Sequence, residues 1–190
     1  MDTLVVDFET FYDKQFSLTK LTTEEYIRDE RFQTIGVAVK RNDEPTVWCS
    51  GSDDEIRNFL SSYNWKESLG LAHNAMFDAA ILSWKYSICP RGWLDTLSMA
   101  RAHHGSEVGG SLKKLVEHYE LGQKGIEVDN ALGKRREDFT KESMDAYAAY
   151  CVNDVELTYK LFHVLGGNFS KSELKLIDAT IRMFSEPVLE

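Results

Sequence analysis

The first ten residues contain the feature that most restricts how this chain can fold, an apolar run that ends in two acids. The run extends from Leu4 to Val6, and Asp7-Phe-Glu9 follows it directly. In an extended strand successive side chains point to opposite faces, so Asp7 and Glu9 share one face and the other face is apolar. Like charges held together in a partly desolvated place require a compensating cation. The pattern indicates a site for Mg²⁺ or Mn²⁺, which prefer oxygen ligands; the alternative is an ordinary strand whose acids lie at its solvated end.

Size and composition are typical of one globular domain. The chain has 190 residues, 43% hydrophobic and 28% charged, so we expect a single domain over residues 1–190. It shows no apolar run of membrane-spanning length and no basic signal segment near its start, which predicts a cytoplasmic protein with no membrane partner. The net charge of −9 argues against binding polyanions through bulk electrostatics, although cations held by acids could still attract one. The scattered cysteines, predicted to be small buried residues, are Cys49, Cys89 and Cys151.

Periodicity, turn residues and capping residues predict a mixed α/β architecture. The first three strands should form an antiparallel meander, with a polar excursion over residues 11–29, and two later strands each lead into a helix. This order predicts a mixed five-stranded sheet with helices on both faces. Strands are predicted over residues 4–10, 33–40, 46–49, 70–73 and 92–95. Helices are predicted over residues 53–62, 74–82, 96–103, 111–119, 140–165 and 170–186.

Two of the predicted helices each place an acid in an otherwise apolar stretch. In Asn74-x-x-x-Asp78 an amide and a carboxylate lie one turn apart on the same helix face. Tyr150-x-x-x-Asp154 places a phenol and a carboxylate in the same way. Taken singly, Asp78 and Asp154 could each be a solvent-facing acid on an amphipathic helix. With the pair on the first strand they complete a set of four acids, each in its own local setting, that could share a metal site.

The segments that carry these acids resemble the three motifs of the DEDD, or DnaQ-like, 3′→5′ exonucleases. The segments are Val-Asp-Phe-Glu-Thr at residues 6–10, His-Asn-Ala-Met-Phe-Asp at 73–78 and Tyr-Cys-Val-Asn-Asp at 150–154. The third has the Tyr-x-x-x-Asp form of the tyrosine subgroup. The chain looks most like the proofreading domain of family A, DNA polymerase I-like, enzymes, particularly those of phages. This resemblance implies a ribonuclease H-like fold and the cytosol of a bacterium or of a phage-infected host cell.

The resemblance also implies a reaction, the metal-dependent release of nucleoside monophosphates from the 3′ end of single-stranded or frayed DNA. Two divalent cations, Mg²⁺ or Mn²⁺, would serve as cofactors. By resemblance Asp7, Glu9 and Asp154 bind the first ion, Asp7 bridges to the second, and Asp78 acts mainly through water. Tyr150 would orient the attacking water, since a phenol with a pKa near 10 is a poor base at neutral pH.

Residues close to the motifs are candidates for contacts with the substrate. Thr10 and Phe11 directly follow the first acid pair and could contact the terminal nucleotide, although Phe11 could equally belong to the core. Asn74 could contact the strand, orient the acid on its own helix or cap that helix. The Lys134-Arg135-Arg136 run could hold backbone phosphates or form a solvated loop, and Lys113-Lys114 has the same two interpretations.

A competing motif assignment starts from His73. The histidine subgroup uses His-x-x-x-x-Asp as its third motif, and His73 to Asp78 has that spacing. Accepting it would require another acid between Glu9 and His73, where the chain offers acids of loops or caps such as Asp43 and Asp53. It would also leave the Tyr-x-x-x-Asp pattern unexplained, so His73 is predicted as a strand-end residue near the site.

Three functions remain open on these residues. The first is DNA proofreading, with a polymerase domain outside this chain as a partner, because little follows Glu186-Pro187. The second is an exoribonuclease of the ribonuclease D type, which has the same fold. The third is a noncatalytic nucleic-acid-binding or polymerase-binding module whose acids are structural. The sequence does not decide between an excised domain and a free-standing nuclease.

Overall fold

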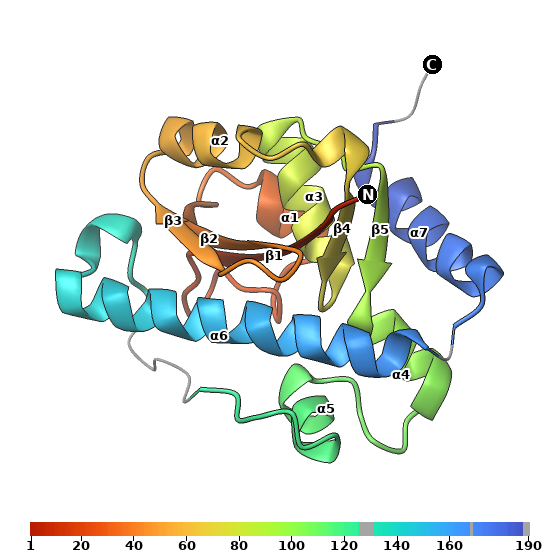
Figure 1. Ribbon diagram of the computed structural model, residues 1–190. Helices are drawn as coiled ribbons and strands as arrows, with labels where there is room; N and C mark the ends of the chain where they lie inside the picture. The colour runs from red at the N-terminus through yellow and green to blue at the C-terminus, as the bar shows by residue number, and fades with distance from the viewer. Residues whose placement is uncertain (126–130, 168, 188–190) are drawn as a thin grey trace.

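A mixed five-stranded sheet forms the centre of the computed structural model, which describes residues 1–125, 131–167 and 169–187 (Figure 1). The strand order is β3-β2-β1-β4-β5, with β1 in the middle. Pairing is antiparallel between β1, β2 and β3 and parallel between β1, β4 and β5, which confirms the predicted α/β fold class. The strands are β1 (Thr3–Thr10), β2 (Thr34–Arg41), β3 (Val47–Ser50), β4 (Leu69–Ala72) and β5 (Gly92–Asp95).

Helices cover both faces of the sheet. The long helix α6 (Lys141–Gly166) runs along one face of the sheet, and α3 (Ala75–Tyr86) packs on the other (Figure 1). Beside α3 lie α1 (Thr23–Arg28), α2 (Asp53–Ser61) and α7 (Lys171–Ser185), whereas α4 (Thr96–His104) and α5 (Leu112–His118) pack against α6. No helix in the described part of the chain is both long and apolar enough to span a bilayer.

The alternation of β1 sets the direction of its acids. Leu4, Val6 and Phe8 belong to the buried cluster that includes residues of α3. Val5 instead belongs to the cluster that contains residues of α6. Because side chains two apart on a strand share a face, Asp7 and Glu9 point to the α6 side as Val5 does.

Residues 11–29 differ from the predicted polar excursion, because they contain helix α1. Thr22 and Glu25 form a reciprocal capping box at its start, and the helix buries Tyr26 and Ile27 against the core. The Thr-x-x-Glu pattern was a sequence signal for this helix, but six residues are too short to show a clear apolar period.

The cysteines follow the sequence prediction only in part. All three are free thiols, and Cys151 is buried, whereas Cys49 and Cys89 are half-buried. Cys151 lies on the face of α6 that packs against β1, so its neighbours are the first acid pair.

Candidate active site

The end of β1 and the middle of α6 come together around the first acid pair. The hydroxyl of Tyr147 donates a hydrogen bond of 2.8 Å to Oε2 of Glu9, and the Cys151 thiol lies 3.3 Å from Oδ2 of Asp7. Tyr147 and Cys151 are four residues apart, one turn along the same face of α6. Two contacts from one helix therefore fix the orientation of both carboxylates.

Asp78 approaches the same strand from the opposite side. It lies in the first turn of α3, is only 3% exposed, and its Oδ1 accepts a hydrogen bond of 3.0 Å from the backbone N–H of Phe8. The parallel pairing of β1 with β4 extends only to Val5, so a side chain can bind the backbone of β1 beyond that point. The alternative of a solvent-facing acid is wrong for Asp78, because its carboxylate is buried.

The charges of the acids act on one another. Burial raises the pKa of Asp7 well above its ordinary value, and the charges of Asp78 and Asp154 raise it further. For Glu9 burial is again the main cause of a strongly raised pKa, followed by the charge of Asp7. The pKa of Asp78 is raised by burial, with the Phe8 hydrogen bond opposing the rise. Positive charge at this site would stabilise the ionised carboxylates.

Asp154 and Tyr150 lie one turn apart on α6, as the sequence predicts, and a lysine joins them. Asp154 is 8% exposed, and Nζ of Lys124 lies 3.5 Å from its Oδ2. The same ammonium group lies 5.5 Å from the centre of the Tyr150 ring. Burial raises the pKa of Tyr150 to about 12. The charge of Asp154 adds to this rise, and the hydrogen bond and charge of Lys124 oppose it. The phenol is therefore a hydrogen-bond donor at neutral pH.

The donor set fits a hard divalent cation. The predicted ligands are all carboxylates, and carboxylate oxygens are preferred by Mg²⁺ and Mn²⁺. Ligand atoms of Asp7, Glu9 and Cys151 lie within 4.8 Å of one another. The pKa values of Asp7 and Glu9 are raised although the charge of Lys124 opposes the rise, and a dication at this site would oppose it further. Asp7 and Glu9 therefore offer a hard divalent cation two carboxylates close together, beside the Cys151 thiol.

The candidate substrate residues Thr10 and Phe11 lie in different environments. Thr10 is half-buried, and its hydroxyl shares a hydrogen bond of 2.8 Å with the hydroxyl of Tyr26. Phe11 is 6% exposed and stacks on Phe16, and the guanidinium of Arg135 covers its ring at 4.1 Å. The ring thus packs in the core, one of its two alternatives, and a contact of Phe11 with the terminal base stays a prediction.

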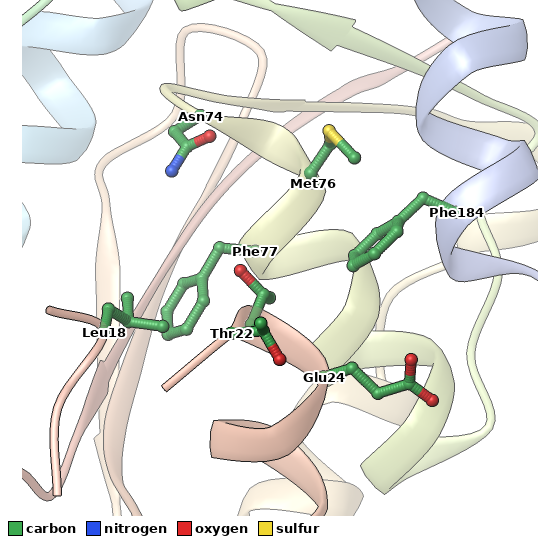
Figure 2. Close-up of a pocket in the computed structure, with 8 residues that line it drawn as sticks. Leu18, Thr22, Glu24, Asn74, Met76, Phe77 and Phe184 are labelled. Carbon is green, nitrogen blue, oxygen red and sulfur yellow. The ribbon is translucent and has the colours of Figure 1, made fainter. Parts of the chain in front are cut away.

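Asn74 is exposed beside the site, but it does not cap its helix in the expected way. Its backbone adopts a left-handed conformation with φ of 68°, which asparagine tolerates better than most residues, and its side chain makes no capping hydrogen bond. Its N–H donates instead to Oδ1 of Asp95 at 2.9 Å. Asn74, Met76 and Phe77 line a pocket of about 460 Å³ next to the start of α3. Figure 2 shows how these side chains lie.

His73 and the Lys134-Arg135-Arg136 run contact other parts of the protein, whereas Lys113 and Lys114 are exposed. His73 bridges the Thr96 hydroxyl and the Gly110 carbonyl, each at 2.7 Å, and burial lowers its pKa. This is a structural role at a strand end, as predicted. In the Lys134-Arg135-Arg136 run, all three residues are half-buried, and the backbone N–H of Arg136 donates to Gln33 at 2.9 Å.

Sequence reasoning missed three residues at the site: Tyr147, Cys151 and Lys124. Tyr147 and Cys151 lie seven and three residues before Asp154, which is the spacing of one helix face, so periodicity could have identified them. Lys124 belongs to a loop, and no local pattern predicts where a loop lysine will point.

A mixed sheet of this order, flanked by helices on both faces, is a ribonuclease H-like fold. The family model of the 3′-5′ exonuclease matches residues 22–168, and the chain belongs to that family. This match includes Asp78, Tyr150 and Asp154. The predicted relationship to the DEDD-type exonucleases is thereby confirmed.

Solved structures share the fold at low sequence identity. NrnC from Brucella melitensis has a TM-score of 0.69 and 14% identity, over 96% of this chain and 81% of that one, and has also been solved with Mg²⁺ and with pGG. RNase D from Trypanosoma brucei, in complex with RNA U12, has a TM-score of 0.72 and 15% identity, over 99% of this chain and 65% of that one. The catalytic core of RRP6 from Trypanosoma brucei has a TM-score of 0.60 and 17% identity, over 99% of this chain and 49% of that one. A comparison with curated protein sequences finds no match.

Proposed function

We propose that this member of the 3′-5′ exonuclease family removes nucleoside monophosphates from the 3′ end of single-stranded or frayed DNA, as a proofreading activity does. The carboxylates of β1, α3 and α6 gather around the end of the central strand, close enough for their charges to act on one another, and this is the observation that carries the proposal. The carboxylates lie close enough for the charge of one to raise the pKa of another, an arrangement that a bound cation would stabilise. The acids are Asp7, Glu9, Asp78 and Asp154.

Two Mg²⁺ or Mn²⁺ ions are the proposed cofactors. Asp7, Glu9 and Asp154 would hold the first, Asp7 would also contact the second, and Asp78 would act mainly through water. When bound, the ions would lower the pKa of a water molecule and stabilise negative charge on the phosphate and the leaving oxygen.

The chain's own contacts prepare this site before a ligand arrives. Tyr147 holds Glu9, the Cys151 thiol contacts Asp7, and the Phe8 N–H holds Asp78. Groups fixed in advance do not have to be ordered during the reaction, which lowers its barrier.

Tyr150 would orient the attacking water. A phenol whose pKa is raised to about 12 keeps its proton at neutral pH, so it can donate a hydrogen bond but does not serve as a general base. Thr10 and Asn74, half-buried and exposed respectively, remain the proposed contacts to the terminal nucleotide. A polymerase domain outside this chain is the proposed protein partner, and the cytoplasm the proposed location.

RNA is the second candidate substrate. Solved structures with this fold include RNase D bound to RNA U12 and NrnC bound to pGG, and this observation favours an exoribonuclease. Preference for RNA would require contacts to the 2′-hydroxyl, the group that distinguishes the two substrates.

Digestion of matched 5′-labelled DNA and RNA strands tests the proposal. With Mg²⁺ the wild-type chain should shorten the DNA from its 3′ end in single-nucleotide steps, and EDTA should stop the reaction. The Asp7→Ala, Glu9→Ala double variant should give no digestion above background. Preferential shortening of RNA would select the exoribonuclease, and digestion that persists in EDTA or in the double variant would contradict the proposed site.

A further inference from the structure

A short segment before the third motif is fixed along α6 next to the acids. The carbonyl of Gln123 accepts a hydrogen bond of 3.1 Å from the side chain of Asn153, the residue before Asp154. A Cβ on Gly125 would lie 3.3 Å from Cδ2 of Tyr150, so the backbone passes close to that ring. These contacts on either side of Lys124 place its side chain over the acid site.

The ammonium group of Lys124 lies beside the carboxylate of Asp154, where a metal ion bound to that carboxylate would also lie. Its Nζ lies 3.5 Å from Oδ2 of Asp154, and the two side chains are 23% and 12% exposed. Burial disfavours the charged lysine, but Asp154 and Tyr150 outweigh this effect and raise its pKa. The position of the ammonium group beside this carboxylate therefore lets Lys124 offset part of the negative charge of Asp154.

We propose that Lys124 is a built-in counter-cation that competes with divalent metal for Asp154 and must move away when metal binds. This inference rests on the proposed metal site. An ammonium and a dication beside the same carboxylate repel each other, and the repulsion is strong where both are partly shielded from water. The lysine therefore weakens metal binding, and it holds the metal-free site together until metal is available.

Calorimetric titration with Mn²⁺ in the absence of nucleic acid tests the competition directly. Lys124→Gln should bind Mn²⁺ more tightly than the wild type, with a Kd lower by about two- to fivefold, the size expected for removing one partly exposed ion pair. Lys124→Arg keeps the positive charge and should leave the Kd within about twofold of the wild-type value. Lys160→Gln is the matched control, because Lys160 is an exposed lysine of α6 and its replacement changes the net charge equally.

Thermal melting supplies a second measurement on the same variants. In EDTA, Lys124→Gln should melt at a lower temperature than the wild type, and the increase on adding Mn²⁺ should be larger. If the wild type binds Mn²⁺ and the Kd of Lys124→Gln is unchanged or higher, the proposed competition is overturned and the proposed function is not. Absence of Mn²⁺ binding by the wild-type chain would overturn the proposed function and the competition with it.

Discussion

Removing the hydrogen bond from Tyr147 to Glu9 tests whether activity depends on the fixed orientation of the Glu9 carboxylate, because the carboxylate itself stays in the protein. Tyr147→Phe removes only the hydroxyl that donates to Oε2 at 2.8 Å. The ring should stay in place, since it is 5% exposed and stacks on Phe139 at 5.3 Å between centroids. A hydrogen bond to a charged group contributes about 1.5–3 kcal/mol, which corresponds to about ten- to hundredfold in a rate or binding constant.

The assay is the 3′ shortening of a labelled strand with Mg²⁺, read as kcat/KM. Tyr147→Phe should lose about ten- to hundredfold, because Glu9 would keep its charge but lose its fixed orientation. Tyr159→Phe is the matched control: it lies on the same helix and its hydroxyl also donates to a carboxylate, Asp43, at 2.8 Å, but this bond is exposed. The control should lose less than about twofold. Equal activity of Tyr147→Phe and wild type, with both folded, would refute the role assigned to this bond.

Three further predictions concern stability. In EDTA the free energy of unfolding should fall as pH rises above about 4, the ordinary pKa range of a carboxyl group, and should keep falling until pH passes the raised pKa that Asp7 has in the folded state. The fall occurs because, in this pH range, the folded state keeps a proton that the unfolded state releases. Urea unfolding at several pH values should show a smaller fall for Asp7→Asn, and parallel curves would contradict this. His73→Ala should lower the free energy of unfolding by about 2–3 kcal/mol through loss of two hydrogen bonds, and a change below about 0.5 kcal/mol in urea unfolding would show that the bridge is unimportant. Gly70→Ala should lower the free energy of unfolding by about 1–3 kcal/mol, because the added Cβ would lie 2.7 Å from the buried Trp93 ring. An unchanged melting temperature would mean that the ring moves aside without cost.

The acids could be predicted from the sequence because each lies in a regular element with a fixed period. Alternation along a strand places Asp7 and Glu9 on one face, and the four-residue spacing of a helix joins Tyr150 to Asp154. The order of strands and helices gave the mixed sheet for the same reason. Asp78 shows the limit of this reasoning, since a helix acid can be exposed or buried until its neighbours are known.

What the sequence could not supply depends on tertiary contacts. Lys124 reaches Asp154 only because its loop is fixed by Asn153, and nothing local to residue 124 indicates that. Phe11 follows the first motif closely enough to suggest a substrate contact, yet packing against Phe16 and Arg135 places it in the core. Asn74 starts its helix as predicted, but through a left-handed backbone rather than a side-chain cap.

Binding of Mn²⁺ by the wild-type chain and by Asp7→Asn is the most direct test of the central claim that these acids form one cation site. Asp7 is surrounded by the other acids, so its replacement should weaken or abolish the Mn²⁺ signal while the fold, followed by circular dichroism, is retained. The account predicts saturable binding by the wild type and at least about a tenfold higher Kd for Asp7→Asn. Equal affinity of the two proteins, or no binding by the wild type, would contradict it.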